Sequence, residues 1–132
     1  MRRIAVLAAA TLAAVPAHAL TIRDDEGGSV IAYAMRMRDL AEPVRITGMC
    51  ESSCTLYLAA DDVCAARYAM FMFHAAYDLR DGERNENGTQ YMLEHYPAPL
   101  REFIERRGGL SGAEMWLTGW DLIDMGAVRE CR

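Results

Sequence analysis

Apolar positions along the first part of the chain follow two alternating periodicities. Residues 20–23 place apolar side chains at every second position, which predicts a strand. Residues 29–41 repeat apolar side chains at the spacing of one helix face, and Pro43 ends that helix. Residues 44–46 predict a second short strand, so the chain begins in the order strand, helix, strand.

The next part of the chain repeats this order with a more apolar strand. Residues 52–60 predict a helix and residues 61–67 a loop. Residues 68–73 are apolar on both faces, as is usual for a central strand of a parallel sheet. Residues 76–88 are polar and contain two glycines, which predicts a long loop.

The last third of the chain is predicted to be helical. Residues 89–96 and 100–107 form two helices separated by prolines, and a Gly-Gly pair ends the second. Capping-box patterns at residues 111–114 and 118–121 predict two further short helices. The alternation of strands and helices predicts an α/β domain with a mostly parallel sheet.

The first 19 residues have the pattern of a secretory signal peptide. Two arginines follow Met1, residues 4–15 are apolar, and an A-x-A cleavage pattern ends at Ala19. This apolar stretch is too short to cross a bilayer as a helix. We therefore expect cleavage after Ala19, a periplasmic or secreted location without membrane association, and a single domain over residues 20–132.

The charge of the chain restricts its partners. The net charge is −5, and removal of Arg2 and Arg3 with the signal peptide moves it to −7. An acidic chain without a basic cluster argues against nucleic acid or an anionic membrane as a partner. All 14 basic residues are arginines, so a Ser–Lys dyad is excluded and an activated serine must use histidine.

Four cysteines follow the predicted cleavage site: Cys50, Cys54, Cys64 and Cys131. An even number in an exported protein predicts two disulfides, and three pairings are open. One of them joins Cys54 to Cys64 and Cys50 to Cys131. A metal site made of the first three cysteines and His74 is the alternative, but its spacing C-x3-C-x9-C-x9-H lacks the short paired knuckles of structural zinc sites. We therefore expect disulfides, with no metal and no cofactor.

The candidate chemistry centres on Ser52 and His74. Ser52 lies at a small-residue turn before an apolar helix, and His74 ends the apolar strand that follows. A serine at a strand-to-helix turn and a histidine at the end of a neighbouring strand are the parts of a nucleophile–base pair. The alternative is structural: Ser52 or Ser53 caps the helix, and His74 is a core histidine bonded to a carbonyl.

Several short blocks occur in a fixed order along the chain. They are DEGGSV at 25–30, G-x-x-x-S ending at Ser52, then Arg67, His74, and LTGWDLIDMG at 117–126. In this order and spacing the blocks resemble the proteolytic subunit of the Clp protease family, within the crotonase-like superfamily. The resemblance covers about residues 20–131 and implies a crotonase-like ββα superhelix, reduced in size, with a mostly parallel sheet.

A second set of blocks is similar to that of small exported proteins of alphaproteobacteria. These blocks are C-x-S-[AS]-C-T, here CESSCT at 50–55, then FHA at 73–75, YPAPLR at 96–101, GGL at 108–110 and a final cysteine. This second resemblance agrees with the predicted export.

The resemblance to the protease implies roles for individual residues. Ser52 matches the nucleophile and His74 the general base, while the backbone N–H groups of Gly28 and Ser53 match the oxyanion hole. Glu114 falls where an aspartate orients the histidine, although it equally fits a helix capping box. The implied function is a small exported serine hydrolase, a peptidase or esterase acting on a peptide or ester substrate.

Two departures from the protease family qualify this function. The strand and helix that precede the first glycine block in the family are missing, and the connection after His74 is short where the family builds ring contacts. A homo-oligomer is compatible with the sequence, but a stacked ring with an ATPase partner is not expected. The alternative is a catalytically silent, disulfide-stabilised envelope domain that acts as a binding module. Acyl-thioester chemistry, a third reading, needs coenzyme A, which an exported protein lacks.

Overall fold

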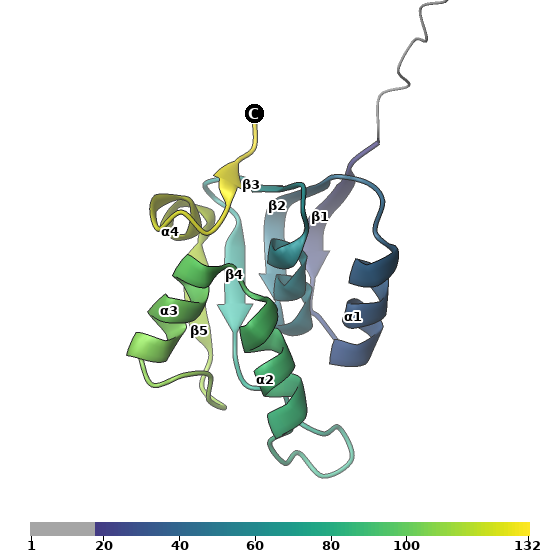
Figure 1. Cartoon of the computed structure of the whole chain (residues 1–132), viewed down its shortest axis with the longest axis vertical. Coiled ribbons are helices and arrows are strands. Elements are labelled where there is room, and N and C mark those ends of the chain that lie inside the picture. Colours follow the sequence, from purple (N-terminus) through teal and green to yellow (C-terminus); the bar gives the residue numbers. More distant parts are fainter. Residues whose placement is uncertain (1–17) are drawn as a thin grey trace, which may run out of the picture.

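The computed structural model describes residues 18–132 (Figure 1). The predicted signal peptide lies outside these residues except for its last two positions. The elements in chain order are β1 (Leu20–Asp25), α1 (Val30–Asp39), β2 (Val44–Glu51), the 3-10 helix η1 (Ser52–Ala59), β3 (Val63–Ala65), β4 (Met70–Phe73), α2 (Glu86–His95), α3 (Ala98–Arg106), β5 (Met115–Thr118), α4 (Gly119–Asp124) and β6 (Arg129–Glu130). Over the described part of the chain, no helix has the length and apolar character needed to cross a membrane.

The strands form one curled, mostly parallel sheet around β2. β1 pairs along one edge of β2. The other edge of β2 is shared: its first half pairs with β3, as in Val44↔Val63, and its second half with β4, as in Glu51↔Met72. β6 adds to β3 in parallel and β5 to β4 antiparallel. Because two strands share one edge of β2, the sheet divides there. Helices and strands alternate along the chain, so the mixed α/β class predicted from the sequence is confirmed.

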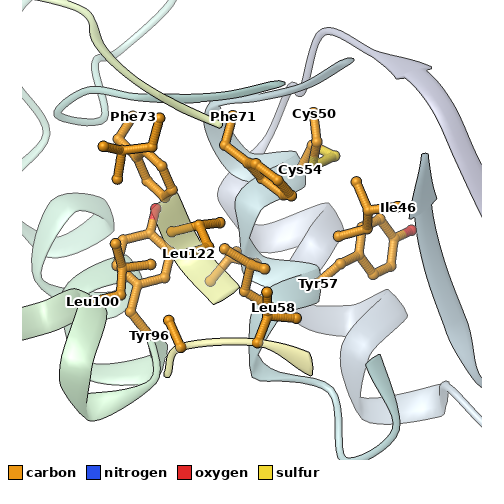
Figure 2. Close-up of a cluster of buried hydrophobic side chains, with 14 of the residues drawn as sticks. Ile46, Cys50, Cys54, Tyr57, Leu58, Phe71, Phe73, Tyr96, Leu100 and Leu122 are labelled. Carbon is orange, nitrogen blue, oxygen red and sulfur yellow. A yellow bond between two sulfur atoms is a disulfide. The ribbon is translucent and has the colours of Figure 1, made fainter. Parts of the chain in front are cut away.

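The 3-10 helix η1 occupies the centre of the hydrophobic core. It contacts α1 on one side and α2 on the other, and it packs on β2 and β4 (Figure 1). Figure 2 shows side chains from this core converging from several elements. Its largest fully buried apolar members include Val44, Ile46, Leu56, Leu58, Phe71, Phe73, Met92, Leu100, Ile104 and Leu122. Each such side chain contributes roughly 1.5–3 kcal/mol through removal from water.

A close backbone approach fixes the register of β1. The pairing with β2 shifts between Ile22 and Asp24, and Gly48 lies opposite this irregularity. A Cβ atom at Gly48 would stand 1.9 Å from the carbonyl oxygen of Arg23, so only glycine fits there. The irregularity brings Asp25, at the end of β1, level with Cys50 near the end of β2.

Several elements differ from the sequence-based expectations. β2 continues to Glu51 instead of ending at 46, and β3 lies inside the predicted loop 61–67. Residues 111–114 form no helix: the chain turns there, with the Ala113 N–H donating to Ser111 Oγ at 3.2 Å, and then enters β5. The second capping box is confirmed, since Thr118 and Asp121 bond each other reciprocally at the start of α4.

The two disulfides join Cys50 to Cys54 and Cys64 to Cys131. The prediction of two disulfides is confirmed, and of the three pairings that the sequence left open this is the one present, not the pairing of Cys54 with Cys64 and of Cys50 with Cys131. Cys50 and Cys54 meet because the chain reverses between β2 and η1, which leaves their Cα atoms 5.3 Å apart. Cys64 meets Cys131 because β6 pairs with β3. With the four sulfurs bonded in two pairs, none of these cysteines is free to act as a metal ligand.

Candidate functional site

The predicted site residues lie where three parallel strands end. Gly28 comes after β1, Ser52 directly after β2, and His74 directly after β4. In Figure 1 the arrowheads of these strands point to one edge of the sheet, and the loop before α2 passes beneath it. The carboxyl ends of parallel strands form the edge at which α/β sheets bind ligands.

The register of the sheet brings Ser52 and His74 to neighbouring positions. Glu51 pairs with Met72, so Ser52 stands level with Phe73 and His74 lies one residue further along the adjacent strand. Both side chains are half-buried and line one cavity of about 1530 Å³, which Gly28 and Glu114 also line. The structure therefore brings together four of the five residues that the sequence assigns to the catalytic machinery.

Ser52 adopts a backbone conformation that is uncommon for its residue type. Its φ is 56°, and it is the only residue other than glycine with a positive φ in the stretch 18–132. This conformation turns the chain sharply from β2 into η1. A serine held in a strained strand-to-helix turn is the arrangement of a nucleophile elbow, in which the hydroxyl is presented to substrate.

The turn at Ser52 is held by buried contacts on both sides. The disulfide between Cys50 and Cys54 spans it, and both cysteines are fully buried. The buried Thr55 hydroxyl bonds the carbonyl oxygen of Ser52 at 2.5 Å and the hydroxyl of Tyr96 at 2.6 Å. These contacts stabilise the unusual conformation of Ser52.

The glycine block after β1 packs directly on this turn. A Cβ atom at Gly27, whose φ is 83°, would lie 2.6 Å from the carbonyl oxygen of Glu51 and 2.9 Å from Cβ of Ser52. Glycine is therefore required at position 27, both for its conformation and for the close contact. The contact sets the distance between the Gly27-Gly28 backbone and the Ser52 hydroxyl.

Ser53 is fully buried, and its side chain binds the backbone of Gly28. Ser53 Oγ accepts a hydrogen bond from the Gly28 N–H at 2.7 Å and donates one to the Gly28 carbonyl oxygen at 2.8 Å. The Gly28 N–H that the resemblance assigns to an oxyanion hole is thus engaged within the protein. A substrate oxygen can receive this N–H only after the bond to Ser53 Oγ is broken.

His74 is oriented by a backbone carbonyl. Its Nδ1 lies 2.6 Å from the carbonyl oxygen of Ala75, and its ring stacks on Tyr77 with 5.7 Å between ring centroids. A carbonyl oxygen only accepts, so this contact places the proton on Nδ1 and leaves Nε2 as the basic nitrogen. Over the described residues, no hydrogen bond joins His74 to Ser52 or to Glu114.

Glu114 lies in the same cavity but serves another partner. Its Oε2 accepts a hydrogen bond from the indole Nε1 of Trp116 at 3.0 Å. The expectation that Glu114 belongs to a capping box is wrong, because residues 111–114 form no helix. Its role as the orienting carboxylate stays a prediction, with the carbonyl of Ala75 now holding the Nδ1 side of the imidazole.

Two further residues position the glycine block, and sequence reasoning gave neither of them a role. Asp25 Oδ1 accepts a hydrogen bond from the Gly27 N–H at 2.9 Å and another from the Tyr33 hydroxyl. Burial, together with the hydrogen bond to Asp25, raises the pKa of the Tyr33 hydroxyl. The order Asp-x-Gly after a strand is typical of an Asx turn, so this pattern in the sequence could have predicted the bond from the Gly27 N–H to Asp25.

Comparison of the chain with protein-family models and with curated proteins found no match.

Proposed function

We propose that the protein is a small exported serine hydrolase, a peptidase or esterase with a reduced crotonase-like fold. The observation that carries this proposal is the left-handed conformation of Ser52 at the turn from β2 into η1, in one cavity with His74. Ordinary helix capping does not need that conformation, since an N-cap residue lies in the extended region. The curled, mostly parallel sheet and the two disulfides agree with the proposed family and with export.

The chemistry follows from these positions. Ser52 Oγ attacks the carbonyl carbon of the substrate and passes its proton to Nε2 of His74. His74 then protonates the leaving group as its bond to the carbonyl carbon breaks, and an acyl-enzyme forms. Water, deprotonated by His74, attacks this acyl group and releases Ser52 with its proton restored.

The oxyanion hole requires a local rearrangement. The N–H groups of Gly28 and Ser53 stabilise the developing oxyanion, and each such donor is worth on the order of 10²–10³ in rate. Gly28 first exchanges its bond to Ser53 Oγ for the substrate oxygen. Apart from its chain neighbours, no residue has an atom within 4 Å of where a Cβ of Gly28 would stand, so this side of the glycine is open.

Two hydrogen bonds favour a second candidate function. The Gly28 N–H is satisfied by Ser53, and His74 makes its hydrogen bond to Ala75 and none to Ser52 within residues 18–132. A catalytically silent envelope domain that uses the cavity only for binding accounts for both contacts without rearrangement.

Labelling with a fluorophosphonate probe separates the two functions. The mature protein, residues 20–132 with both disulfides intact, is treated with the probe, and the modified residue is identified by mass spectrometry. We expect labelling of Ser52 that is lost in Ser52→Ala and reduced at least about a hundredfold in His74→Ala. Ser111→Ala is the matched control, since Ser111 is exposed and does not line the cavity. Absence of Ser52-dependent labelling would overturn the hydrolase and leave the binding module.

A further inference from the structure

Large apolar side chains gather at the mouth of the cavity. Seven large hydrophobic residues are exposed in the part of the chain that the structure describes, and four of them line this cavity. These four are called the apolar rim: Ile31, Met35, Tyr77 and Leu79. Leu79 is 83% exposed and Ile31 74% exposed. Exposed apolar side chains concentrated in one place mark a binding surface.

The helix α1 contributes half of the apolar rim from the face that does not contact the core. Its inner face buries Tyr33, while Ile31 and Met35 stand one turn apart on the exposed side. An amphipathic helix normally carries polar residues on that side. The exposed apolar pair therefore serves no purpose in the packing of α1, and methionine is well suited to adapt to varied apolar ligands.

The loop before α2 presents the other half of the apolar rim in an ordered form. Tyr77 and Arg84 form an isolated antiparallel bridge, and the Asp78 N–H donates to the carbonyl oxygen of Glu83 at 2.8 Å. Arg84 anchors this hairpin by bonding the carbonyl oxygen of Leu110 at 2.7 Å. Since Tyr77 also stacks on His74, the apolar rim extends to the histidine that is proposed to act as the general base.

The charges around the cavity favour a cationic ligand. Four carboxylates line it, those of Glu26, Glu51, Asp78 and Glu114, against the two guanidinium groups of Arg38 and Arg84. Both arginines are engaged by carboxylates outside the lining, Arg38 by Asp39 and Arg84 by Glu86. Asp78 is likewise paired with Arg80, which lies outside the lining. Glu26 and Glu51 form no ion pair within residues 18–132. A negatively charged cavity attracts positively charged ligands, so a negatively charged ligand such as a fatty acid is disfavoured.

We infer that the cavity binds an extended polypeptide segment in which apolar side chains alternate with basic ones. Binding of this segment does not depend on the proposed function; only its cleavage would. The apolar side chains lie on the apolar rim, and the basic ones lie near Glu26 and Glu51. A volume of about 1530 Å³ exceeds the roughly 300–1,000 Å³ of small-molecule pockets and accommodates several residues of a chain.

Peptide binding to the Ser52→Ala variant tests the inference without requiring catalysis. A dye-labelled peptide of alternating leucine and arginine is titrated by fluorescence anisotropy, beside peptides in which glutamate replaces arginine or serine replaces leucine. We expect the leucine–arginine peptide to bind at least about tenfold more tightly than either. Equal binding of all three peptides, or tighter binding of the acidic one, would overturn the inference.

Substitutions in the cavity lining separate the recognition of apolar side chains of the peptide from the recognition of its basic side chains. Ile31→Ser with Leu79→Ser is expected to weaken binding about tenfold at any salt concentration. Glu26→Gln with Glu51→Gln is expected to weaken binding several-fold at low salt and to reduce its salt dependence. Tyr68→Ser is the matched control, because Tyr68 is 75% exposed but lies outside the cavity lining. A loss of binding in Tyr68→Ser equal to that of the rim variants would contradict the assignment.

Other occupants give distinct results. A dimer in sedimentation velocity that dissociates with Leu79→Ser would mean that the apolar rim covers a second copy of this chain. Binding of anionic lipid vesicles but not of the peptide would mean a membrane ligand. Either result overturns the inference. The proposed function is scored separately, by fluorophosphonate labelling of Ser52, so peptide binding without labelling removes the hydrolase and keeps the binding site.

Discussion

The Ser53 hydroxyl forms two hydrogen bonds with the peptide backbone of Gly28, one received from the N–H at 2.7 Å and one given to the carbonyl at 2.8 Å. Ser53, the residue next to the proposed nucleophile, thus binds the Gly28 N–H that the proposed reaction needs for its oxyanion hole. The two residues are 25 positions apart in the chain, and the contact links the loop after β1 to the first turn of η1. A change at Ser53 therefore bears directly on the accessibility of the Gly28 N–H.

Ser53→Ala frees the Gly28 N–H for a substrate oxygen. We expect fluorophosphonate labelling of Ser52 to become about fivefold faster, because a hydrogen bond of about 1 kcal/mol no longer competes. Unfolding by urea is expected to show a loss of about 1–3 kcal/mol, because the substitution removes both hydrogen bonds between Ser53 and Gly28. A labelling rate equal to that of the wild type, with Ser111→Ala measured in parallel, would show that the Gly28 N–H takes no part.

Replacement of Gly27 by alanine disturbs the Ser52 turn sterically. Both Gly27 and Gly82 have positive φ, of 83° and 72°, but only Gly27 has backbone atoms where a Cβ would stand. Gly82→Ala is expected to cost about 1–2 kcal/mol from its left-handed conformation alone. Gly27→Ala is expected to cost about 1–3 kcal/mol more from overpacking and to abolish labelling of Ser52. Equal losses of unfolding free energy in the two variants would contradict the close contact.

The two disulfides differ in what they contribute. Removal of the bond between Cys64 and Cys131, by alanine at both, is expected to cost about 4 kcal/mol, since it closes a loop with a sequence separation of 67. Removal of the bond between Cys50 and Cys54 is expected to cost only about 2 kcal/mol, because its sequence separation is 4. Urea unfolding without reductant measures both.

The two double variants should rank in the opposite order when Ser52 labelling is measured instead of unfolding free energy. The bond between Cys50 and Cys54 spans the Ser52 turn, so its removal is expected to slow labelling more than removal of the other bond. The rates are compared in conditions where both variants remain folded, as verified by circular dichroism. A parallel loss of stability and labelling in both variants would mean that the short disulfide has no specific effect on Ser52.

Stability should fall in alkaline solution because of buried tyrosines. Burial raises the pKa of the Tyr96 hydroxyl, and burial with the hydrogen bond to Asp25 raises that of Tyr33. In the unfolded chain tyrosine ionises near pH 10. The contribution of the neutral hydroxyls is therefore fully present below about pH 10 and is lost as the pH rises from there toward the raised values.

Tyr96→Phe isolates this effect. The variant is expected to lose about 1 kcal/mol at neutral pH with the bond to Thr55, and to show a shallower alkaline decline than the wild type. Urea midpoints measured between about pH 8 and pH 11 give both quantities. An alkaline decline as steep as that of the wild type would assign the pH dependence to other groups.

Local pattern was sufficient to predict most helices and the α/β class. The apolar periodicity of α1 and the prolines around α3 act within a few residues of one another, so they can be recognised without the fold. The capping box at Thr118 was recognised for the same reason. The same type of pattern at Ser111 did not give a helix, because β5 pairs with β4 across Met72↔Trp116 and strand pairing there outweighs the local preference.

Features that depend on distant contacts could not be predicted. β3 exists because its three residues complete the edge of β2, and nothing in its own sequence requires a strand. The pairing of Cys64 with Cys131 depends on β6 returning beside β3. The positions of Ser52 and His74 could be predicted from their places at strand ends, whereas the engagement of Ser53 with Gly28 depends on how β1 and β2 are aligned.

The disulfide between Cys64 and Cys131 also determines how the protein responds to a cut in its chain. Both halves of the molecule hold one of these cysteines, and the hairpin between them carries Arg80, whose side chain is 88% exposed. A trypsin cut after Arg80 therefore leaves the two fragments covalently joined. The nicked protein should migrate as one band on a denaturing gel until reductant is added, and only then separate into two.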